Sequence, residues 1–493
     1  MRTVIGILGW ALAVASCGES TEASPHGSGG SSGSQPGPNR ASTGGAGNET
    51  GDFPSGATSL AGLSSIGGAH STTAGSTAAS SGGDGANGSA SPTRGGAHNS
   101  GGAPSSGGRA PISGGENAAA EAGAGGESSA AGAPPFEGAQ RRVKELDLGG
   151  AHSCVRLADG KVVCWGANEA GQLGDGALGN RNTAAPVHGL NNAVSVGTGT
   201  AHTCATLTDG TVTCWGLNAH GQLGDRAPVN SIIPQSVPGV SAVVMVSAGA
   251  WHTCALRANG TVYCWGDNSH GQIGLGRTSP DIAPPTLIPS LESVVRLAAS
   301  ADQTCALLET GAIYCWGNND FGQLGDGTRL LDRAAPVPVQ LTGHAIDVAV
   351  GARHACALLH DGSVQCWGGN SDGGLGDGTV EPSLLPVTVR GVRGATQLAL
   401  GDYHSCALSS DGKLRCWGYN ALGQLGDGTQ TNRNTAVLVS SLSAVVEVAA
   451  GSVHTCALNR DDQVACWGLN YDGELGDESN SNRSSPVFVV GME

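Results

Sequence analysis

The sequence predicts an all-β fold of seven similar four-stranded units, of the kind found in β-propellers, preceded by a disordered segment. The tripeptide Cys-Trp-Gly occurs seven times, and successive copies begin 50 or 51 residues apart. Such a regular period indicates one structural unit repeated along the chain. Within each unit, short β-prone runs alternate with Gly, Asn and Asp turn signals. Before residue 140 the chain is instead mostly Gly, Ser and Ala, a composition with too little apolar surface to fold.

Residues 1–17 have the features of an export signal. Arg2 is followed by an uncharged, mostly apolar stretch that is too short to span a bilayer as a mature helix. Small residues then lead to Cys17, which resembles the bacterial lipoprotein signal, although Val14 stands where Leu is usual. The alternative is an ordinary secretory signal. We expect an exported cell-envelope protein, held at an outer membrane or the cell surface by lipid on Cys17.

Residues 18–140 contain long runs of Gly, Ser and Ala and are expected to be disordered. Two interpretations remain open for this segment. It is either a flexible tether that lifts a folded head away from a membrane, or a filler without a specific role. The repeats occupy residues 141–493, so only this part can bury a core.

The charge balance limits the partners. The formal net charge is −16, and residues 141–493 carry 20 basic and 31 acidic residues. Nucleic acids and anionic membrane surfaces are bound by clustered Lys and Arg, and no segment here is basic. We therefore expect no nucleic-acid partner, and contact with a membrane only through the lipid anchor.

The third repeat shows how the strands are arranged. We expect an inner strand near 244–248, a second strand near 252–256 and a third near 261–265. A fourth, outer strand is expected in the Pro-containing stretches, such as 234–238 at the end of the second repeat. Four short antiparallel strands every 50 residues or so are typical of a propeller blade. We name them strands A to D, from the inside outward.

The cysteines are expected to pair within each repeat. There are 15, of which Cys17 is one and the other 14 fall into seven pairs. A three-residue Ala-Asp-Gly turn at 158–160 sets Cys154 opposite Cys164, with Cα atoms roughly 4.5 Å apart, near the short end of the range that a disulfide accepts. The same ten-residue offset separates Cys204 and Cys214, Cys254 and Cys264, Cys305 and Cys315, Cys356 and Cys366, Cys406 and Cys416, and Cys456 and Cys466.

Zinc is the competing interpretation of these pairs, because a His lies two residues before the first Cys in six repeats. Zinc needs a fourth ligand, however, and none recurs nearby, whereas an exported protein meets an oxidising compartment. We therefore favour disulfides. A structural role is also expected for the repeated histidines, which are His152, His202, His252, His354, His404 and His454. No metal, cofactor or catalytic constellation is expected.

The complete repeat resembles that of the regulator of chromosome condensation family. In the sixth repeat the matching positions are Gly401, His404, Leu408, Asp411-Gly412, Trp417-Gly418, Asn420 and Gly423-Gln424-Leu425-Gly426. The resemblance covers about residues 143–493 and implies a seven-bladed β-propeller. Departures from the pattern occur at Ser300 and Gln303 in the fourth repeat, Gly374 in the fifth, and Asp462 and Glu474 in the seventh. We also expect the strand near 486–490 and the strand near 143–148 to complete each other's blade and so close the ring.

The best-known family member is a nucleotide exchange factor for a nuclear GTPase that also binds chromatin. An exported, acidic protein does not suit either role. We instead expect a surface-anchored module that binds a protein or a glycan. The alternative is a regulator of an enzyme or GTPase, either an inhibitor or an exchange-factor-like protein. A lyase or hydrolase is the third hypothesis, but it needs a convergent set of acids or bases that the sequence does not offer. We therefore predict that the protein is not an enzyme.

The candidate binding residues are the positions that vary inside the repeat motif. In an up-and-down meander, the loops between strands A and B and between strands C and D emerge on one face. Trp, Tyr and Arg are the residue types that dominate interface energetics. Unselected variation at exposed loops is the alternative explanation. The predicted binding residues are Trp251, Asp302, Phe321, Arg353, Tyr403 and Tyr471.

Overall fold

The structure is a computed structural model that describes residues 142–225 and 227–492. The predicted signal, the lipidation site at Cys17 and the predicted linker 18–140 lie outside the described residues. Within the described part, no helix is long and apolar enough to cross a membrane.

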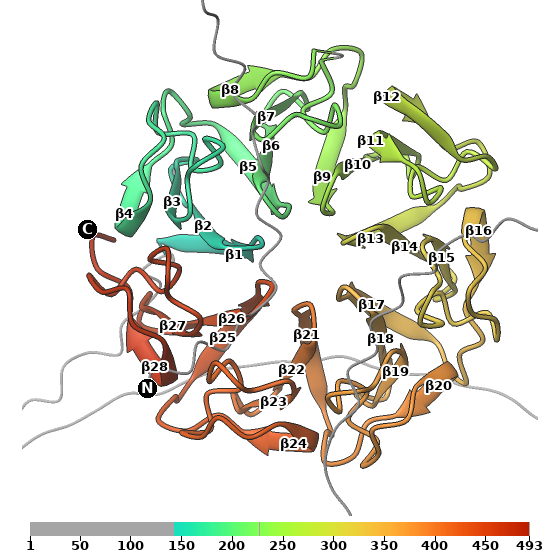
Figure 1. Ribbon diagram of the computed structural model, residues 1–493, viewed down its shortest axis with the longest axis vertical. Coiled ribbons are helices and arrows are strands. Elements are labelled where there is room, and N and C mark those ends of the chain that lie inside the picture. The colour runs from blue at the N-terminus through green and yellow to red at the C-terminus, as the bar shows by residue number, and fades with distance from the viewer. Residues whose placement is uncertain (1–141, 226, 493) are drawn as a thin grey trace, which may run out of the picture. The chain divides into compact units, whose positions relative to one another are not determined.

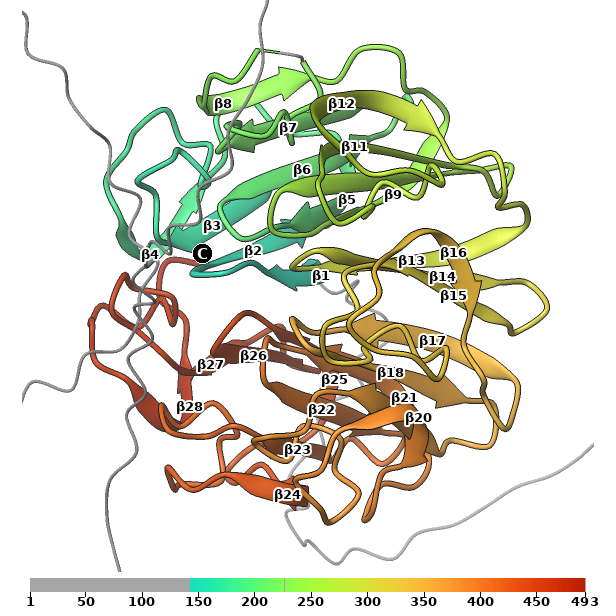
Figure 2. The same ribbon diagram turned by 45° about the vertical axis from the view of Figure 1, so that its right-hand side comes forward.

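Seven four-stranded antiparallel sheets stand around a central axis and form the blades of a β-propeller (Figures 1 and 2). Each blade takes its strands in sequence order from the inner strand A to the outer strand D. We number the blades 1 to 7 along the chain. The all-β, seven-bladed architecture predicted from the repeats is confirmed.

The strands of equivalent position are similar in length and occupy one place in their blades. The inner strands A are β1 (Val143–Leu148), β5 (Ala193–Thr198), β9 (Val243–Ala248), β13 (Val294–Ser300), β17 (Ala345–Val350), β21 (Ala395–Leu400) and β25 (Val445–Ala450). The strands B are β2 (His152–Leu157), β6 (His202–Leu207), β10 (His252–Arg257), β14 (Gln303–Leu308), β18 (His354–Leu359), β22 (His404–Ser409) and β26 (His454–Asn459). The strands C are β3 (Val162–Gly166), β7 (Val212–Gly216), β11 (Val262–Asn268), β15 (Ile313–Gly317), β19 (Val364–Gly368), β23 (Leu414–Gly418) and β27 (Val464–Gly468). The outer strands D are β4 (Arg181–Pro186), β8 (Ser231–Ser236), β12 (Ser279–Leu287), β16 (Arg333–Pro338), β20 (Ser383–Thr388), β24 (Arg433–Leu438) and β28 (Arg483–Phe488).

The hairpin register between strands B and C is the predicted one. The Leu157 amide donates to the Lys161 carbonyl at 2.8 Å, and Cys154 lies opposite Cys164. The strand predicted at 234–238 begins earlier, at Ser231, because the outer strand pairs with strand C as far as Gly216.

Every blade contains one disulfide, which links its strands B and C. The Cα–Cα distances are 4.0 to 4.2 Å, close to the value expected from the hairpin register. The structure thus has the pairing that the turn spacing predicts, and the zinc interpretation is not needed to explain the cysteines. The seven bonds join Cys154 and Cys164, Cys204 and Cys214, Cys254 and Cys264, Cys305 and Cys315, Cys356 and Cys366, Cys406 and Cys416, and Cys456 and Cys466.

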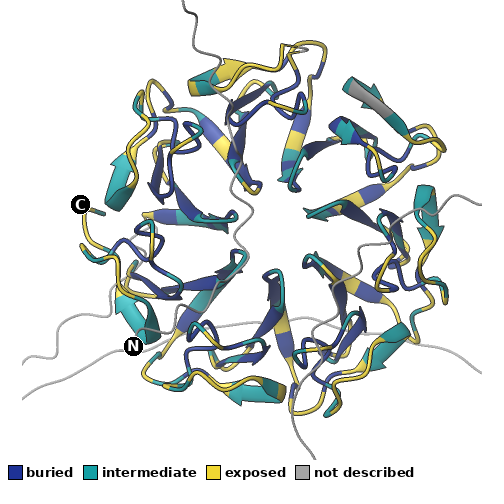
Figure 3. Ribbon diagram, viewed as in Figure 1, coloured by how far each residue is buried: buried dark blue, intermediate teal, exposed yellow. Residues whose placement is uncertain are grey.

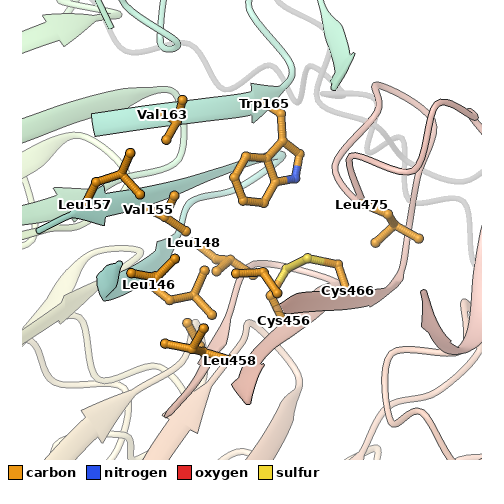
Figure 4. Close-up of a cluster of buried hydrophobic side chains, with 13 residues drawn as sticks. Leu146, Leu148, Val155, Leu157, Val163, Trp165, Cys456, Leu458, Cys466 and Leu475 are labelled. Atoms are coloured by element: carbon orange, nitrogen blue, oxygen red, sulfur yellow. A yellow bond between two sulfur atoms is a disulfide. The ribbon is translucent and has the colours of Figure 1, made fainter. Parts of the chain in front are cut away.

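The core lies between neighbouring blades. Strands A, B and C are largely buried, whereas the outer strands are half-buried or exposed (Figure 3). The Trp of every Cys-Trp-Gly is fully buried. Trp165 of blade 1, for example, shares a cluster with Leu458, Leu475 and the disulfide between Cys456 and Cys466 of blade 7 (Figure 4). The repeated Trp side chains therefore form part of the core between neighbouring blades.

One main-chain carbonyl joins each pair of neighbouring blades. Between blades 2 and 3, the Gln222 carbonyl accepts the Trp265 indole N–H at 2.8 Å and the Thr253 hydroxyl at 2.9 Å. The Nε2 atom of His202 lies 2.9 Å from the same hydroxyl oxygen. Because the single hydroxyl proton is given to the carbonyl, His202 must donate from Nε2. Burial lowers the pKa of His202 to about 3 and keeps the ring neutral, in agreement with its predicted structural role.

The junction between blades 4 and 5 departs from this arrangement on both sides. Gln303 stands in the place of the His, and Ala355 stands in the place of the hydroxyl residue. The Gln303 side-chain amide donates instead to the Gly351 carbonyl at 2.7 Å and to the His354 carbonyl at 3.3 Å. The two exceptions therefore explain each other, since a His facing Ala355 would have no hydroxyl partner there.

The prediction that the chain termini share one blade is wrong. Strand β1 belongs to the sheet of β2, β3 and β4, and β28 belongs to the sheet of β25, β26 and β27. The loop between strands C and D returns each outer strand to strand C of its own repeat, so no strand is exchanged. Blades 7 and 1 close the ring with the bonds used elsewhere: His454 pairs with the Ser153 hydroxyl at 2.9 Å, and the Trp165 indole donates to the Glu474 carbonyl at 2.8 Å.

The side chain of Glu474 introduces an acid at this closing junction, where most repeats have Gln. Its Oε2 atom accepts from the Asp472 amide at 2.9 Å, and its Oε1 atom is buried without a hydrogen-bond partner among the described residues. Burial raises the pKa of Glu474 from 4.5 to about 7. The folded protein therefore binds more protons than the unfolded chain between these two values, and its stability falls as the pH rises through this window.

We predict that the pair formed by His202 and Thr253 behaves as one unit. Thr253→Ala should lower the free energy of unfolding by about 1–3 kcal/mol, because the buried Nε2–H of His202 loses its acceptor. The double variant His202→Gln/Thr253→Ala copies the arrangement of Gln303 and Ala355. It should cost less than the sum of the two single changes by at least about 0.5 kcal/mol. Urea unfolding with the disulfides intact measures all three variants, and strictly additive costs would contradict the coupling.

Glu474→Gln should stabilise the protein in a pH-dependent manner. The gain should grow between about pH 4.5 and 7 and level off above that range, where it reaches on the order of 2–3 kcal/mol. Thermal unfolding at about pH 5 and about pH 8 measures it. Gln424→Glu, at the equivalent position of blade 6, is the matched control and should show the opposite trend. A gain of the same size at both pH values would show that the pKa of Glu474 is not raised.

Candidate functional site

The loops between strands A and B and those between strands C and D form one continuous face. In each blade a carbonyl of the A–B loop accepts a hydrogen bond from the residue that follows Trp-Gly. The Trp251 carbonyl accepts from the Asp267 amide at 2.9 Å, and the Tyr403 carbonyl accepts from the Tyr419 amide at 3.0 Å. The variable side chains of both loops are therefore presented together from a hydrogen-bonded base.

The central channel is lined by the inner strands and encloses about 260 Å³. Its polar side chains are engaged between neighbouring strands. Asp147 accepts from the amide and the hydroxyl of Thr198 at 2.6 and 2.8 Å, and Glu145 accepts from the Val196 amide at 3.2 Å. Burial raises the pKa of Asp147 to about 7. These acids protect the exposed edges of the inner strands, so the loop face is the better candidate site.

Trp251 and Asp302 lie in a group of titratable side chains on blades 2, 3 and 4, which we call the Trp251 cluster. The Trp251 ring packs on the His220 ring, with centroids 4.7 Å apart. His220 Nδ1 lies 3.9 Å from Asp267 Oδ1. Gln272 links Asp267 to Asp302, because its side-chain amide donates to both carboxylates, at 2.8 and 3.4 Å.

His270 and Asp332 complete the Trp251 cluster, and the His270 Nδ1 atom lies 2.8 Å from Asp332 Oδ2. Burial alone would lower the pKa of His270. The hydrogen bond to Asp332 and the charges of Asp302, Asp332 and Asp267 outweigh burial and raise it. Burial and the neighbouring acids likewise raise the pKa of Asp302. The acids around His270 therefore favour the charged form of its ring.

Phe321, Arg353 and Tyr403 form a second group, which we call the Arg353 stack. The Arg353 guanidinium carbon lies 4.6 Å from the centroid of the Phe321 ring and 5.1 Å from that of the Tyr403 ring. These distances are typical of cation–π contacts. The Tyr419 ring meets the Tyr403 ring edge-on, with centroids 6.2 Å apart. The stack thus joins blades 4, 5 and 6.

The two groups share the loop between strands C and D of blade 4. Phe321 near the start of this loop contacts the Arg353 stack, and Asp332 at its end bonds His270 of the Trp251 cluster. Tyr471 lies apart from both groups, on blade 7. Its side chain is 60% exposed, and its carbonyl accepts from the Asn480 side chain at 2.7 Å. Five of the six predicted binding residues are therefore contiguous, and Tyr471 is not.

Sequence reasoning missed several members of the two groups. Asp267 and Tyr419 both occupy the position after Trp-Gly, which differs in every blade except for a repeated Leu. The variability that singled out the other loop positions would have identified this one too. Asp332 stands where other repeats have Asn before an Arg, as in Asn432-Arg433, and this departure is the signal that could have identified it.

The loop between strands C and D is built on an Asn and an Asp. The side-chain amide of Asn470 donates to the Asp477 carboxylate at 3.0 Å and to the carbonyls of Ser479 and Ser481 at 3.1 and 3.2 Å. Asp477 also pairs with Arg483 at 2.8 Å. The Asn470 amide and the Arg483 guanidinium therefore occupy the oxygen atoms of this loop, and the Asp stabilises a turn.

The sequence and the fold match known families. The model of the RCC1-like domain matches residues 194–492. The model of the regulator of chromosome condensation (RCC1) repeat matches residues 143–172 and residues 159–206.

Among curated proteins, the ultraviolet-B receptor UVR8 of Arabidopsis thaliana is 37% identical over 115 residues, which are 22% of this chain and 26% of that protein. The regulator of chromosome condensation of Mus musculus is 34% identical over 120 residues, which are 24% of this chain and 28% of that protein. The matched segments thus span little more than a quarter of these relatives.

Two solved structures are similar in fold. Human WBSCR16 superimposes with a TM-score of 0.59 at 24% identity, covering 64% of this chain and 86% of that one. Prp20p of Saccharomyces cerevisiae gives a TM-score of 0.60 at 23% identity, covering 68% of this chain and 87% of that one. The RCC1-like domain model alone accounts for more than half of the chain. Together with the seven blades, this match shows that the chain belongs to the RCC1-like domain family.

Proposed function

We propose that this protein is a protein-binding propeller that works outside the cytoplasm and recognises its partner through the loop face of blades 2 to 6. The observation that carries this proposal is the contiguity of the Trp251 cluster and the Arg353 stack. Partly exposed Trp, Tyr and Arg side chains on a rigid base are the usual centre of a protein interface. The disulfide in every blade supports a location outside the cytoplasm, since disulfides persist in oxidising surroundings.

The relatives support protein binding in a general sense. Prp20p is described with binding properties toward Gsp1p and histones. Only the idea of a binding propeller is carried over to this chain, because identity at this level supports the fold and not a particular partner. Regulation of an enzyme or GTPase by the same face is the alternative, and the activity of a captured partner with and without this protein separates the two. Glycan binding is tested by titration with soluble envelope glycans.

We predict that the loop face is required for capture of the partner. The full chain with Trp251→Ala and Tyr403→Ala should lose most of the protein that the wild type retains from solubilised cell envelopes, because both changes remove interface anchors. Tyr263→Ala is the control, since Tyr263 is an aromatic residue on strand C that packs with Arg257 near the opposite face. Unchanged capture by the double variant, with an unchanged melting temperature, would rule out this face.

We further propose that Cys17 carries a lipid that holds the propeller to the cell envelope through the Gly/Ser/Ala-rich linker. The small residues that precede Cys17 support this proposal. Mass spectrometry of the N-terminal peptide from native membranes should find an acylated Cys17 as the first residue. Cys17→Ser should release the protein from the membrane fraction. A mature chain that starts elsewhere, or that stays in the membrane after this change, would contradict the anchor.

A further inference from the structure

Arg353 differs from the arginines of this protein that form ion pairs with carboxylates. Its side chain is exposed, and it makes no hydrogen bond or ion pair with any described residue. Six other arginines pair with an Asp or Glu, and these are Arg156, Arg181, Arg296, Arg333, Arg433 and Arg483. Other described arginines, such as Arg257, also lack a carboxylate partner, and Arg353 is set apart by a guanidinium that lies over two aromatic rings.

The surroundings of Arg353 hold its guanidinium in place. The rings of Phe321 and Tyr403 contact it and restrict its rotamers. Gly369 makes room for this arrangement, because a Cβ atom there would lie 3.2 Å from the Arg353 Cβ and 3.4 Å from the Phe321 Cβ. The Gly369 amide also donates to the Arg353 carbonyl at 2.7 Å, which fixes the backbone of the A–B loop at Arg353. Aromatic contact leaves the N–H edge of a guanidinium free to donate.

The acids near Arg353 are engaged by other groups. Asp402 is half-buried as a residue, and its carboxyl group is enclosed. Burial raises the pKa of this carboxyl, and the Ser452 side chain forms a hydrogen bond with it. The Asp372 carboxylate accepts from the Asn432 side chain and from the Ser371 hydroxyl, both at 3.0 Å. Neither acid forms an ion pair with Arg353, so its donors remain available to a ligand.

Resting on the proposed function, we infer that Arg353 is the receptor for a single carboxylate on the protein partner, which it binds in a bidentate manner between Phe321 and Tyr403. A carboxylate matches the planar fork of a guanidinium, and flanking aromatic rings strengthen the pair by excluding water. The hollow beside Arg353 and Tyr403 measures only about 10 Å³, which is room for about one water, so the carboxylate is bound at the surface and not inside a pocket. The acids of the Trp251 cluster next to it repel polyanions, which favours an isolated Asp or Glu over nucleic acid.

The test uses the full chain and a random-peptide library displayed on phage as the probe. Peptides enriched on the wild type should carry an Asp or Glu. Calorimetric titrations then measure two changes, the replacement of that peptide residue by its amide and the protein variant Arg353→Gln. Each change should weaken binding roughly tenfold or more. The two losses should not add, because both break one contact. Arg353→Lys should also weaken binding, since it keeps the charge but loses the fork.

The matched control is Arg257→Gln. Arg257 also lies over an aromatic ring, that of Tyr263 at 5.8 Å, but it donates to the Ser241 carbonyl and lies at the B–C end of its blade. This change should leave peptide binding unaltered. The melting temperatures of both variants should stay close to that of the wild type, because neither guanidinium belongs to the core.

Several outcomes would overturn the assignment. Enriched peptides without an acidic residue would do so, as would full affinity of Arg353→Gln for peptides that need their acid. Binding of single-stranded DNA that Arg353→Gln abolishes would assign the guanidinium to phosphate. Self-association that the same variant disperses in sedimentation would assign it to a second copy. If Trp251→Ala loses the captured envelope protein while Arg353→Gln retains it, the proposed binding face is supported and the proposed carboxylate receptor is wrong.

Discussion

The structure depends on one repeated hydrogen-bond arrangement between blades. In each junction a main-chain carbonyl of the C–D loop accepts the indole N–H of the next blade's Trp, as Gln222 accepts from Trp265. In six junctions a neutral His and a hydroxyl complete it. Burying an unsatisfied polar group costs more than its hydrogen bond returns, so the members must be kept or lost together. The seventh junction, with Gln303 and Ala355, obeys this constraint by replacing both.

The same constraint separates the framework from the site. His, Trp and the Gly-Gln-Leu-Gly stretch face inward and are fixed by the junctions. The residues between them, such as Trp251 and Arg353, project from the loops that these junctions anchor. Their side chains can differ from blade to blade without breaking an inter-blade bond. Blades of the same backbone structure therefore present a face whose side chains differ from blade to blade. Acids and histidines lie over blades 2 to 4, and an arginine flanked by aromatic rings lies over blades 4 to 6.

Local patterns predicted most of the fold. Turn spacing placed Cys154 opposite Cys164, and the disulfide forms in that register. Ring closure was mispredicted, because strand pairing across the long C–D loop is a non-local property that the repeat period does not determine. The binding face was predicted only as variable positions. Which of them meet in space, such as Phe321 with Arg353, depends on how neighbouring blades are offset. Asp332 and Gly369 acquire their roles only from these contacts.

We propose that rigid blade junctions support a binding face on the A–B and C–D loops. Amide hydrogen exchange of the full chain, with and without a partner captured from the cell envelope, tests it most directly. We expect slow exchange at the junction strands in both states, and added protection confined to the A–B and C–D loops of blades 2 to 6. Added protection confined to the B–C hairpins on the opposite face would contradict it.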